Sequence, residues 1–301
     1  MHLVFLMYAL FASIFTVAKA TLQYAQPFFL LGTRMVLAGI ILLGYQFIFK
    51  RELLRWNARY LKPLLMVIFF TFFLTNVFEF WGLQFLSSSK TCFIYSLSPF
   101  ISALLSYFIF TEKLTYKKWI GLLIGFCGMF PVFIEDSQAE TGLTHLLFFS
   151  AAELALIAAV FCSCYGWISM QKLCKDDYSP LTANGFGMFF GGILALITSF
   201  IFEKWEPVPV TQWTPVIEGT IYMLIISNLL AYNMYSFLLR RFTATFMSFA
   251  GFVTPIFVSI YGRIFLGELF SPTFFISASI VFIGLYLFHQ EELKLQGLEI
   301  R

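Results

Sequence analysis

Ten apolar stretches, each about long enough to cross a lipid bilayer, dominate this chain of 301 residues. The hydrocarbon core of a bilayer is about 30 Å thick, and a helix needs roughly 20 apolar residues to cross it. The stretches occupy residues 3–20, 28–49, 62–86, 91–110, 117–134, 146–170, 180–202, 215–239, 243–266 and 272–289. The connections between them are too short for a soluble domain. The sequence therefore predicts an all-α polytopic membrane protein with ten transmembrane helices.

The composition supports this prediction and limits the kinds of partner that the chain is expected to have. With 60% hydrophobic and 12% charged residues, the chain has too little polar surface to form a water-soluble globule. The lipid bilayer is thus the expected surroundings, and nothing indicates nucleic acid. The number of cysteines is odd and four of the five lie inside apolar runs, which favours free thiols. The three histidines are far apart, so neither a metal site nor a cofactor is predicted. The oligomeric state stays open.

The chain repeats itself at a nearly constant spacing. An offset of 156 residues joins Pro99 to Pro255, Glu112 to Glu268 and Gly128 to Gly284. An offset of 153 joins Pro27, Gly32, Met35, Gly39 and Ile40 to Pro180, Gly185, Met188, Gly192 and Ile193. We therefore expect two related units, residues 1–140 and 141–301. Because each holds five helices, an odd number, the second must enter the membrane inverted, which is the geometry of alternating-access carriers.

Positive charges predict the orientation. If the N-terminus is inside the cell, 14 of the 19 Lys and Arg residues fall on the inner side, five of them in or beside the loop of residues 50–61. Loops rich in Lys and Arg stay in the cytoplasm. Both termini are therefore expected to be cytoplasmic.

Several residues carry a resemblance to a known family. The segment Leu86-Ser87-Ser88-Ser89-Lys90-Thr91 is followed by Pro99 in a helix, by Glu112 and by Lys118-Trp119-Ile120-Gly121. This pattern resembles the EamA-type half of the drug/metabolite transporter superfamily. The second half, from Arg241-Phe242-Thr243-Ala244 to Gly284, resembles the same unit more loosely.

The resemblance implies a secondary transporter of a small organic metabolite in a bacterial inner membrane. Among the branches of the superfamily, the chain is most similar to the S-adenosylmethionine/S-adenosylhomocysteine carriers of obligate intracellular bacteria. This implies uptake of S-adenosylmethionine, in exchange for S-adenosylhomocysteine. A carrier of amino acids or other amphipathic metabolites is the alternative.

Three charged residues lie more than one helical turn inside the apolar stretches: Arg34, Glu79 and Glu153. Each costs about 2.5 to 3.5 kcal/mol at the centre of a membrane helix, so each needs a role. One interpretation is that Arg34 and Glu79 merely satisfy one another or backbone carbonyls. The other is that they bind substrate. Glu153 comes near the outer end of its helix and fits the mouth of a site.

Asn76 lies three residues before Glu79 and shares its helical face. At the 156 offset these two residues correspond to Tyr232 and Tyr235, which form a stripe with Asn228. If both faces line one cavity, the result is an acidic, aromatic pocket. Such a pocket suits an organic cation, through Coulomb attraction and cation–π contact, and it suits a stacked nucleobase. Packing is the competing interpretation for the tyrosines.

Further candidates for substrate contact are Phe15, Tyr95 and Trp167, although Trp167 also fits an interfacial belt. Pro99 and Pro255 each remove a backbone hydrogen bond from a helix at equivalent places in the two repeats, which predicts a pair of hinges.

The function classes can now be weighed. An enzyme is disfavoured because the chain has no histidine cluster, no paired aspartates at ligand spacing and no Gly-rich phosphate loop. A channel is disfavoured because inverted repeats with kinked helices and a few midplane charges indicate a gated site. A structural or signalling membrane protein is the remaining alternative to a carrier. Within carriers, an unpaired Glu79 favours cations, a pocket governed by Arg34 favours carboxylates, and a zwitterionic substrate can use both.

Overall fold

The computed structural model describes residues 2–54, 58–86, 91, 94–110, 115–140, 150–266 and 272–295, which are almost entirely helical. Six passes are single helices of 20 residues or more: α1 (His2–Thr21), α2 (Pro27–Phe49), α7 (Tyr116–Glu140), α8 (Ala151–Lys175), α9 (Pro180–Phe202) and α14 (Pro272–Leu295). The fourth pass is described from Ile94 and contains α6 (Ser98–Phe110). The remaining three passes are helices interrupted part-way along their length.

The interrupted passes change helix type part-way. The third consists of α3 (Leu61–Met66), the π-helical η3 (Val67–Leu74) and α4 (Thr75–Leu83). The eighth consists of α10 (Trp213–Met223), the π-helical η5 (Leu224–Ala231) and α11 (Tyr232–Leu238). The ninth consists of α12 (Ala244–Ala250), the 3₁₀ turn η6 (Gly251–Val253) and α13 (Thr254–Leu266).

Together these elements confirm ten helical passes, of which six are, among the described residues, long and apolar enough by themselves to cross a membrane. Two short 3₁₀ turns, η1 (Arg51–Leu53) and η2 (Ala58–Tyr60), lie in the loop before α3. The sixth pass lies further along the chain than the predicted residues 146–170. Its start is fixed by Ser150, whose side chain accepts from the Glu153 N–H while the Glu153 carboxylate accepts from the Ser150 N–H.

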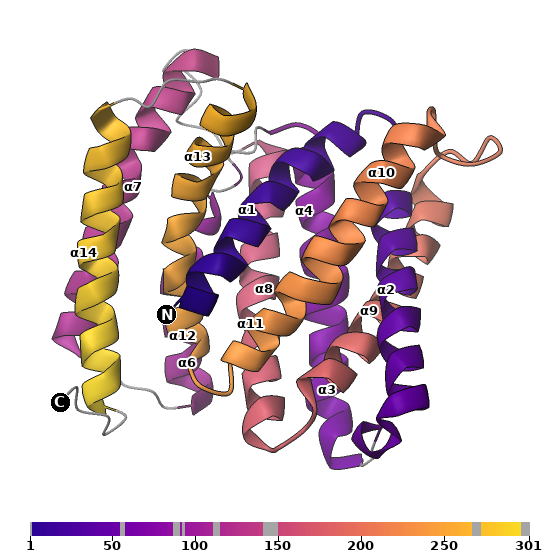
Figure 1. Cartoon of the computed structure of the whole chain (residues 1–301), viewed down its shortest axis with the longest axis horizontal. Coiled ribbons are helices and arrows are strands. Elements are labelled where there is room, and N and C mark those ends of the chain that lie inside the picture. Colours follow the sequence, from indigo (N-terminus) through magenta and orange to yellow (C-terminus); the bar gives the residue numbers. More distant parts are fainter. Residues whose placement is uncertain are drawn as a thin grey trace.

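Equivalent helices of the two repeats pack closely against one another. Figure 1 shows α7 beside α14 at one end of the molecule and α2 near α9 at the other. Glycines allow the close approach: a Cβ atom on Gly39 would lie 2.5 Å from the Phe189 amide nitrogen, and one on Gly192 would lie 2.7 Å from the Val36 amide nitrogen. Small residues at such crossings let membrane helices approach to backbone contact.

The start of α2 is held by the other repeat. Pro27 occupies the first helical position, as Pro180 does in α9, where its fixed φ suits the first turn. The free N–H groups of Phe28 and Phe29 donate to the carboxylate of Glu203, at 2.6 and 2.9 Å. A carboxylate at a helix N-terminus satisfies exposed donors and complements the helix dipole.

Both motif prolines stand at the second residue of a helical segment. Ser98 begins α6 after the turn residues Ser96 and Leu97, and Thr254 begins α13 directly after η6. The fourth and ninth passes are therefore broken before Pro99 and Pro255, instead of being continuous helices with a kink. Glu112, Glu268 and residues 87–90 of the sequence motif lie outside the described residues.

Candidate functional site

A cavity lies at the middle of the bundle, between the two repeats. It contains about 1030 Å³ of empty space, open solvent at its mouth included. The first repeat lines it with its first four passes, and the second repeat lines it with the sixth, eighth and ninth passes of the chain. Eight of the ten predicted substrate contacts stand on its wall. They are Phe15, Arg34, Asn76, Glu79, Tyr95, Trp167, Tyr232 and Tyr235.

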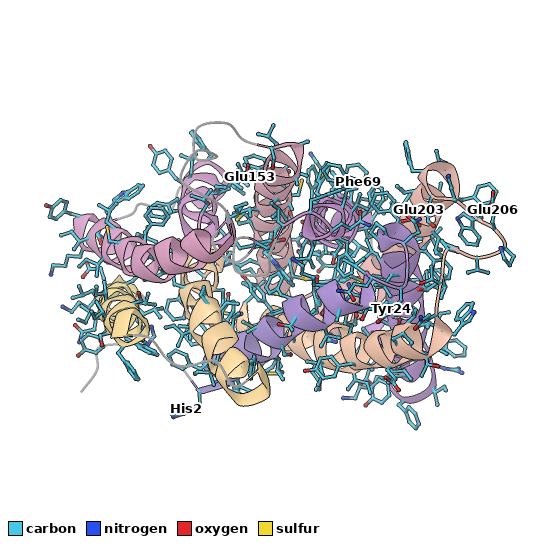
Figure 2. All side chains as sticks on the ribbon, turned by 90° about the horizontal axis from the view of Figure 1, so that it is seen from above. His2, Tyr24, Phe69, Glu153, Glu203 and Glu206 are labelled. Atoms are coloured by element: carbon cyan, nitrogen blue, oxygen red, sulfur yellow. The ribbon has the colours of Figure 1, made fainter. Side chains whose placement is uncertain are left out.

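Two predicted contacts do not line this cavity. Asn228 is fully buried in η5, and its amide lies 3.0 Å from the Met35 sulfur and 3.7 Å from the Met188 sulfur. Glu153 lies in the first turn of α8, where the capping box holds its carboxylate. Looking down on the bundle, Figure 2 shows Glu153 toward its edge.

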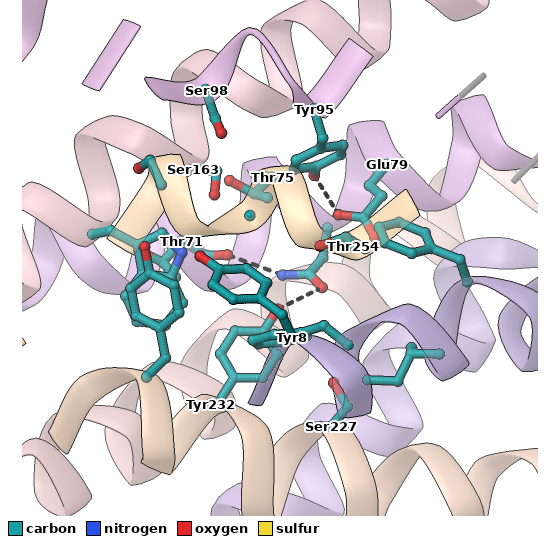
Figure 3. A pocket seen from close by; sticks show the side chains of 18 of the residues that line it. Tyr8, Thr71, Thr75, Glu79, Tyr95, Ser98, Ser163, Ser227, Tyr232 and Thr254 are labelled. Atoms are coloured by element: carbon teal, nitrogen blue, oxygen red, sulfur yellow. Dashed lines mark hydrogen bonds between the residues drawn. The ribbon is translucent and has the colours of Figure 1, made fainter. Parts of the chain in front are cut away.

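The acidic wall of the cavity is formed by Glu79 and Tyr95. Glu79 projects from α4, and one of its carboxylate oxygens accepts a hydrogen bond from the Tyr95 hydroxyl, which comes from the segment before α6 (Figure 3). The Phe15 ring on α1 lies 6.1 Å from the Tyr95 ring. Glu79 therefore faces the cavity with a neutral partner, and its charge is not cancelled by that contact.

Arg34 forms a separate, cationic part of the wall. Its side chain is only 1% exposed, and its guanidinium carbon lies 4.9 Å from the centre of the Phe80 ring. No ion pair within 4.0 Å joins Arg34 to Glu79, and the Arg34 Nε and Nη1 atoms have no hydrogen-bond partner among the described residues. The interpretation that these two charges satisfy one another directly is thus not what the geometry shows.

The aromatic wall lies toward the start of α1 and the later turns of α8. The rings of Trp167 and Tyr235 are stacked with their centres 4.0 Å apart, and the Tyr232 ring lies 5.7 Å from Trp167. Phe11 meets Tyr232 edge-on at 5.7 Å. The Tyr8 hydroxyl donates to the Met247 carbonyl oxygen. The cavity therefore has charged groups on one side and stacked rings on another.

Asn76 connects the two repeats. Its Nδ2 donates to the carbonyl oxygens of Thr71 and Phe72 at 2.9 and 3.3 Å, and its Oδ1 accepts from the Tyr232 hydroxyl at 3.3 Å. A π-helical turn frees backbone carbonyls from their usual partners, and in a membrane a side chain must satisfy them. Asn76 does so beside the cavity.

A model of the EamA-like transporter family matches this chain over residues 1–134 and again over residues 150–289. The chain belongs to the EamA-like transporter family. It is therefore a multi-pass membrane transporter and not an enzyme, and the double match agrees with the repeat read from the sequence.

Named relatives of this family member include two chlamydial proteins. An S-adenosylmethionine/S-adenosylhomocysteine transporter of Chlamydia trachomatis serovar L2 is 38% identical over 97% of this chain and 89% of its own length. The protein with the same description in Chlamydia muridarum is 38% identical over 97% of this chain and 92% of its own. The uncharacterized transporter YetK of Bacillus subtilis is 24% identical over 93% and 83%. A solved crystal structure, 14% identical, shares the fold with a TM-score of 0.75 over 98% of both chains.

The repeat correspondence needs one correction in the EamA-like halves. The π-helical segments η3 and η5 each have eight residues and start at Val67 and Leu224, which is an offset of 157 and not 156. At this offset Asn76 corresponds to Asn233 and Glu79 to Ser236, instead of to Tyr232 and Tyr235. The Asn233 amide confirms the match, because it donates to the carbonyls five and four residues earlier, as Asn76 does.

Sequence reasoning missed much of the polar lining. Thr71, Thr75, Ser163, Ser227 and Ser248 also face the cavity. Small hydroxyl residues are frequent in membrane helices as packing residues, so they gave no signal of their own. A π-helical turn also shifts the face that later residues present, and a regular 3.6-residue period cannot reproduce that shift. Among the described residues, no group of three His, Cys, Asp or Glu is close enough to hold a metal ion.

Proposed function

We propose that this EamA-like transporter carries S-adenosylmethionine across the membrane in exchange for S-adenosylhomocysteine. The observation that carries the proposal is the position of Glu79: a carboxylate on the wall of an aromatic cavity between two repeats, hydrogen-bonded to Tyr95 and within 4.0 Å of no cationic side chain among the described residues. Such a carboxylate attracts the sulfonium or ammonium group of a cationic solute. The description of the chlamydial relatives supports the same substrate pair.

The aromatic wall suits the adenosine end of this substrate. Trp167, Tyr232 and Tyr235 present flat rings to a cavity in which a purine can stack, and base–aromatic stacking is worth about 1 to 3 kcal/mol. A sulfonium beside these rings also gains cation–π attraction of about 0.5 to 2 kcal/mol. One solute that carries a purine and a cationic group uses both walls.

The inverted repeats supply the transport cycle. A site at the interface of two such repeats opens to one side or the other when the repeats exchange conformations. Substrate and counter-substrate bind in turn to the same residues. This favours exchange of two chemically similar molecules, and Pro99 and Pro255 are the proposed hinges.

Ligand binding and exchange test the proposal directly. Purified protein is heated with S-adenosylmethionine, S-adenosylhomocysteine, adenosine and a panel of amino acids. A ligand at 100 times its Kd stabilises the folded state by about 2.7 kcal/mol, so the two adenosyl compounds are expected to raise the melting temperature most. Proteoliposomes loaded with unlabelled S-adenosylhomocysteine should then take up labelled S-adenosylmethionine faster than empty ones.

A carrier of amino acids or other amphipathic metabolites is the second candidate. It is favoured by the buried Arg34, which attracts a carboxylate whatever the rest of the solute is. Stabilisation and uptake of several amino acids, without a response to adenosyl compounds, would support it. No response to any of these metabolites would contradict both candidate substrates.

The orientation is part of the proposal. Positive charges around residues 50–61 favour a cytoplasmic position for both termini, in a bacterial inner membrane. A single cysteine at Ala58, in a variant without the five native cysteines, is expected to react with a membrane-impermeant maleimide only after the cells are opened. Labelling in intact cells would reverse the assignment.

A further inference from the structure

Arg34 is a buried charge that has no ion-pair partner in the part of the chain that the structure describes. Its side chain is 1% exposed within α2, it lines the cavity, and its Nε and Nη1 atoms lack hydrogen-bond partners among the described residues. An uncompensated guanidinium in a membrane protein interior is costly, and such residues mark binding sites for ions or substrates. Among the described residues, the guanidinium lies over the Phe80 ring, which cannot accept hydrogen bonds from two nitrogens.

Glu79, the acidic residue on the cavity wall, forms no ion pair with Arg34. The Glu79 carboxylate lies beyond 4.0 Å from it and accepts from Tyr95 instead. The two side chains come from different passes, α2 and α4, so the cavity holds a fixed positive and a fixed negative charge at separate points. A ligand with one charge of each sign satisfies both, whereas a singly charged ligand satisfies one.

We infer that Arg34 is an anion subsite that binds the carboxylate of an α-amino acid group, and that it makes the transporter reject adenosyl compounds lacking that group. The inference rests on the proposed function, because it assigns the amino-acid end of the same solute. A carboxylate presents two oxygens to the planar guanidinium and forms charge-assisted hydrogen bonds. The neighbouring negative charge of Glu79 favours a zwitterion, whose ammonium balances it, over a phosphate with two negative charges.

Rejection of truncated compounds follows from the cost of leaving Arg34 unpaired. A site built around a buried polar group discriminates strongly against an analogue that cannot pair with it, because the desolvated group then stays unsatisfied. Methylthioadenosine has the adenosyl thioether of S-adenosylhomocysteine but no amino acid. It retains the stacking on Trp167 and Tyr235 and loses the contact with Arg34.

The test compares these two neutral thioethers, so that the sulfonium charge plays no part. The parent protein is expected to bind S-adenosylhomocysteine about 10- to 100-fold more tightly than methylthioadenosine, the range expected for hydrogen bonds to a charged group. Arg34→Gln should remove most of this difference by weakening S-adenosylhomocysteine binding alone. Arg59→Gln, at an arginine 69% exposed and outside the cavity, is the matched control and should leave both affinities unchanged.

The outcomes separate the two proposals. Equal weakening of both ligands by Arg34→Gln, or no weakening of either, overturns the subsite. If that variant does not fold, the test uses the parent protein and the carboxamide of S-adenosylhomocysteine, which lacks the carboxylate. The carboxamide should bind the parent protein as weakly as methylthioadenosine does. If it binds as tightly as S-adenosylhomocysteine, the subsite is overturned. If no adenosyl compound binds, the proposed function fails. L-methionine and its amide then test the carboxylate subsite at Arg34, and equal binding of these two compounds to the parent protein overturns that subsite.

Discussion

The third and eighth passes have the same backbone and different chemistry. Each contains a π-helical segment of eight residues, η3 or η5, and the two are 157 residues apart. Each segment is followed by an asparagine, Asn76 or Asn233, whose amide donates to the carbonyls five and four residues earlier. The repeated feature is therefore the interruption of the helix together with the side chain that satisfies it.

One turn further on, the two passes differ. The first repeat places Glu79 on the cavity wall, and the second places Ser236, whose hydroxyl donates to Asn184 within the protein. Asn76 lines the cavity, whereas Asn233 accepts from Asn184. An inverted-repeat carrier needs matching backbones so that the repeats can exchange conformations. It needs unmatched side chains to hold an asymmetric solute, and the structure combines both.

Glycines at the α2/α9 crossing test whether the backbones match. Gly39→Ala and Gly192→Ala each place a methyl group less than 3 Å from backbone atoms of the other helix. Overpacking costs typically 1 to 3 kcal/mol, and the upper end, about 3 kcal/mol, is expected where backbone must move. Both variants should lower the melting temperature by similar amounts. Gly44→Ala is the control, because nothing lies within 4 Å of its Cβ and no loss is expected.

The asparagines test where the repeats differ. Asn76→Leu and Asn233→Leu each leave freed carbonyls without a donor, which costs about 1 to 3 kcal/mol of stability. Only Asn76→Leu is expected to weaken binding of S-adenosylhomocysteine as well, because only Asn76 faces the cavity. Thermal melting with and without ligand gives both quantities. If Asn233→Leu weakens ligand binding as much as Asn76→Leu does, the conclusion that Asn76 faces the cavity and Asn233 does not is contradicted.

The prolines test the smallest effect, on the rate of exchange. Pro99→Ala and Pro255→Ala each supply an N–H that can extend the helix across the break before α6 or α13. One added hydrogen bond is worth about 0.5 to 1.5 kcal/mol, so exchange in proteoliposomes is expected to slow about 2- to 10-fold while affinity stays the same. Unchanged exchange in a well-expressed variant would remove that proline from the mechanism.

The apolar runs and the duplication were enough to predict the fold. Ten runs of membrane length and the paired glycines and prolines depend on spacing, and spacing survives in the sequence. Glu79, Arg34 and Tyr232 were predictable as site candidates because polar groups are costly in a membrane. Sequence reasoning failed at the π-helical turns, since the extra residue in such a turn changes the face that Asn228 presents. The offset of 156 fails for this pair of passes because their π-helical segments start 157 residues apart. Glu153 is outside the cavity lining and its carboxylate caps the start of α8, a role that the sequence does not distinguish from that of a ligand at the mouth of a site.

The affinity of Glu79→Gln for two ligands tests the central claim most directly. S-adenosylmethionine and S-adenosylhomocysteine differ by a methyl group and one positive charge, and the substitution keeps the size and hydrogen bonding of Glu79 while it removes the negative charge. Titration of purified parent and variant should show about a 10-fold or greater loss for S-adenosylmethionine, with a clearly smaller loss for S-adenosylhomocysteine. Unchanged binding of S-adenosylmethionine, or equal losses for both ligands, would contradict an acidic site for a cationic solute.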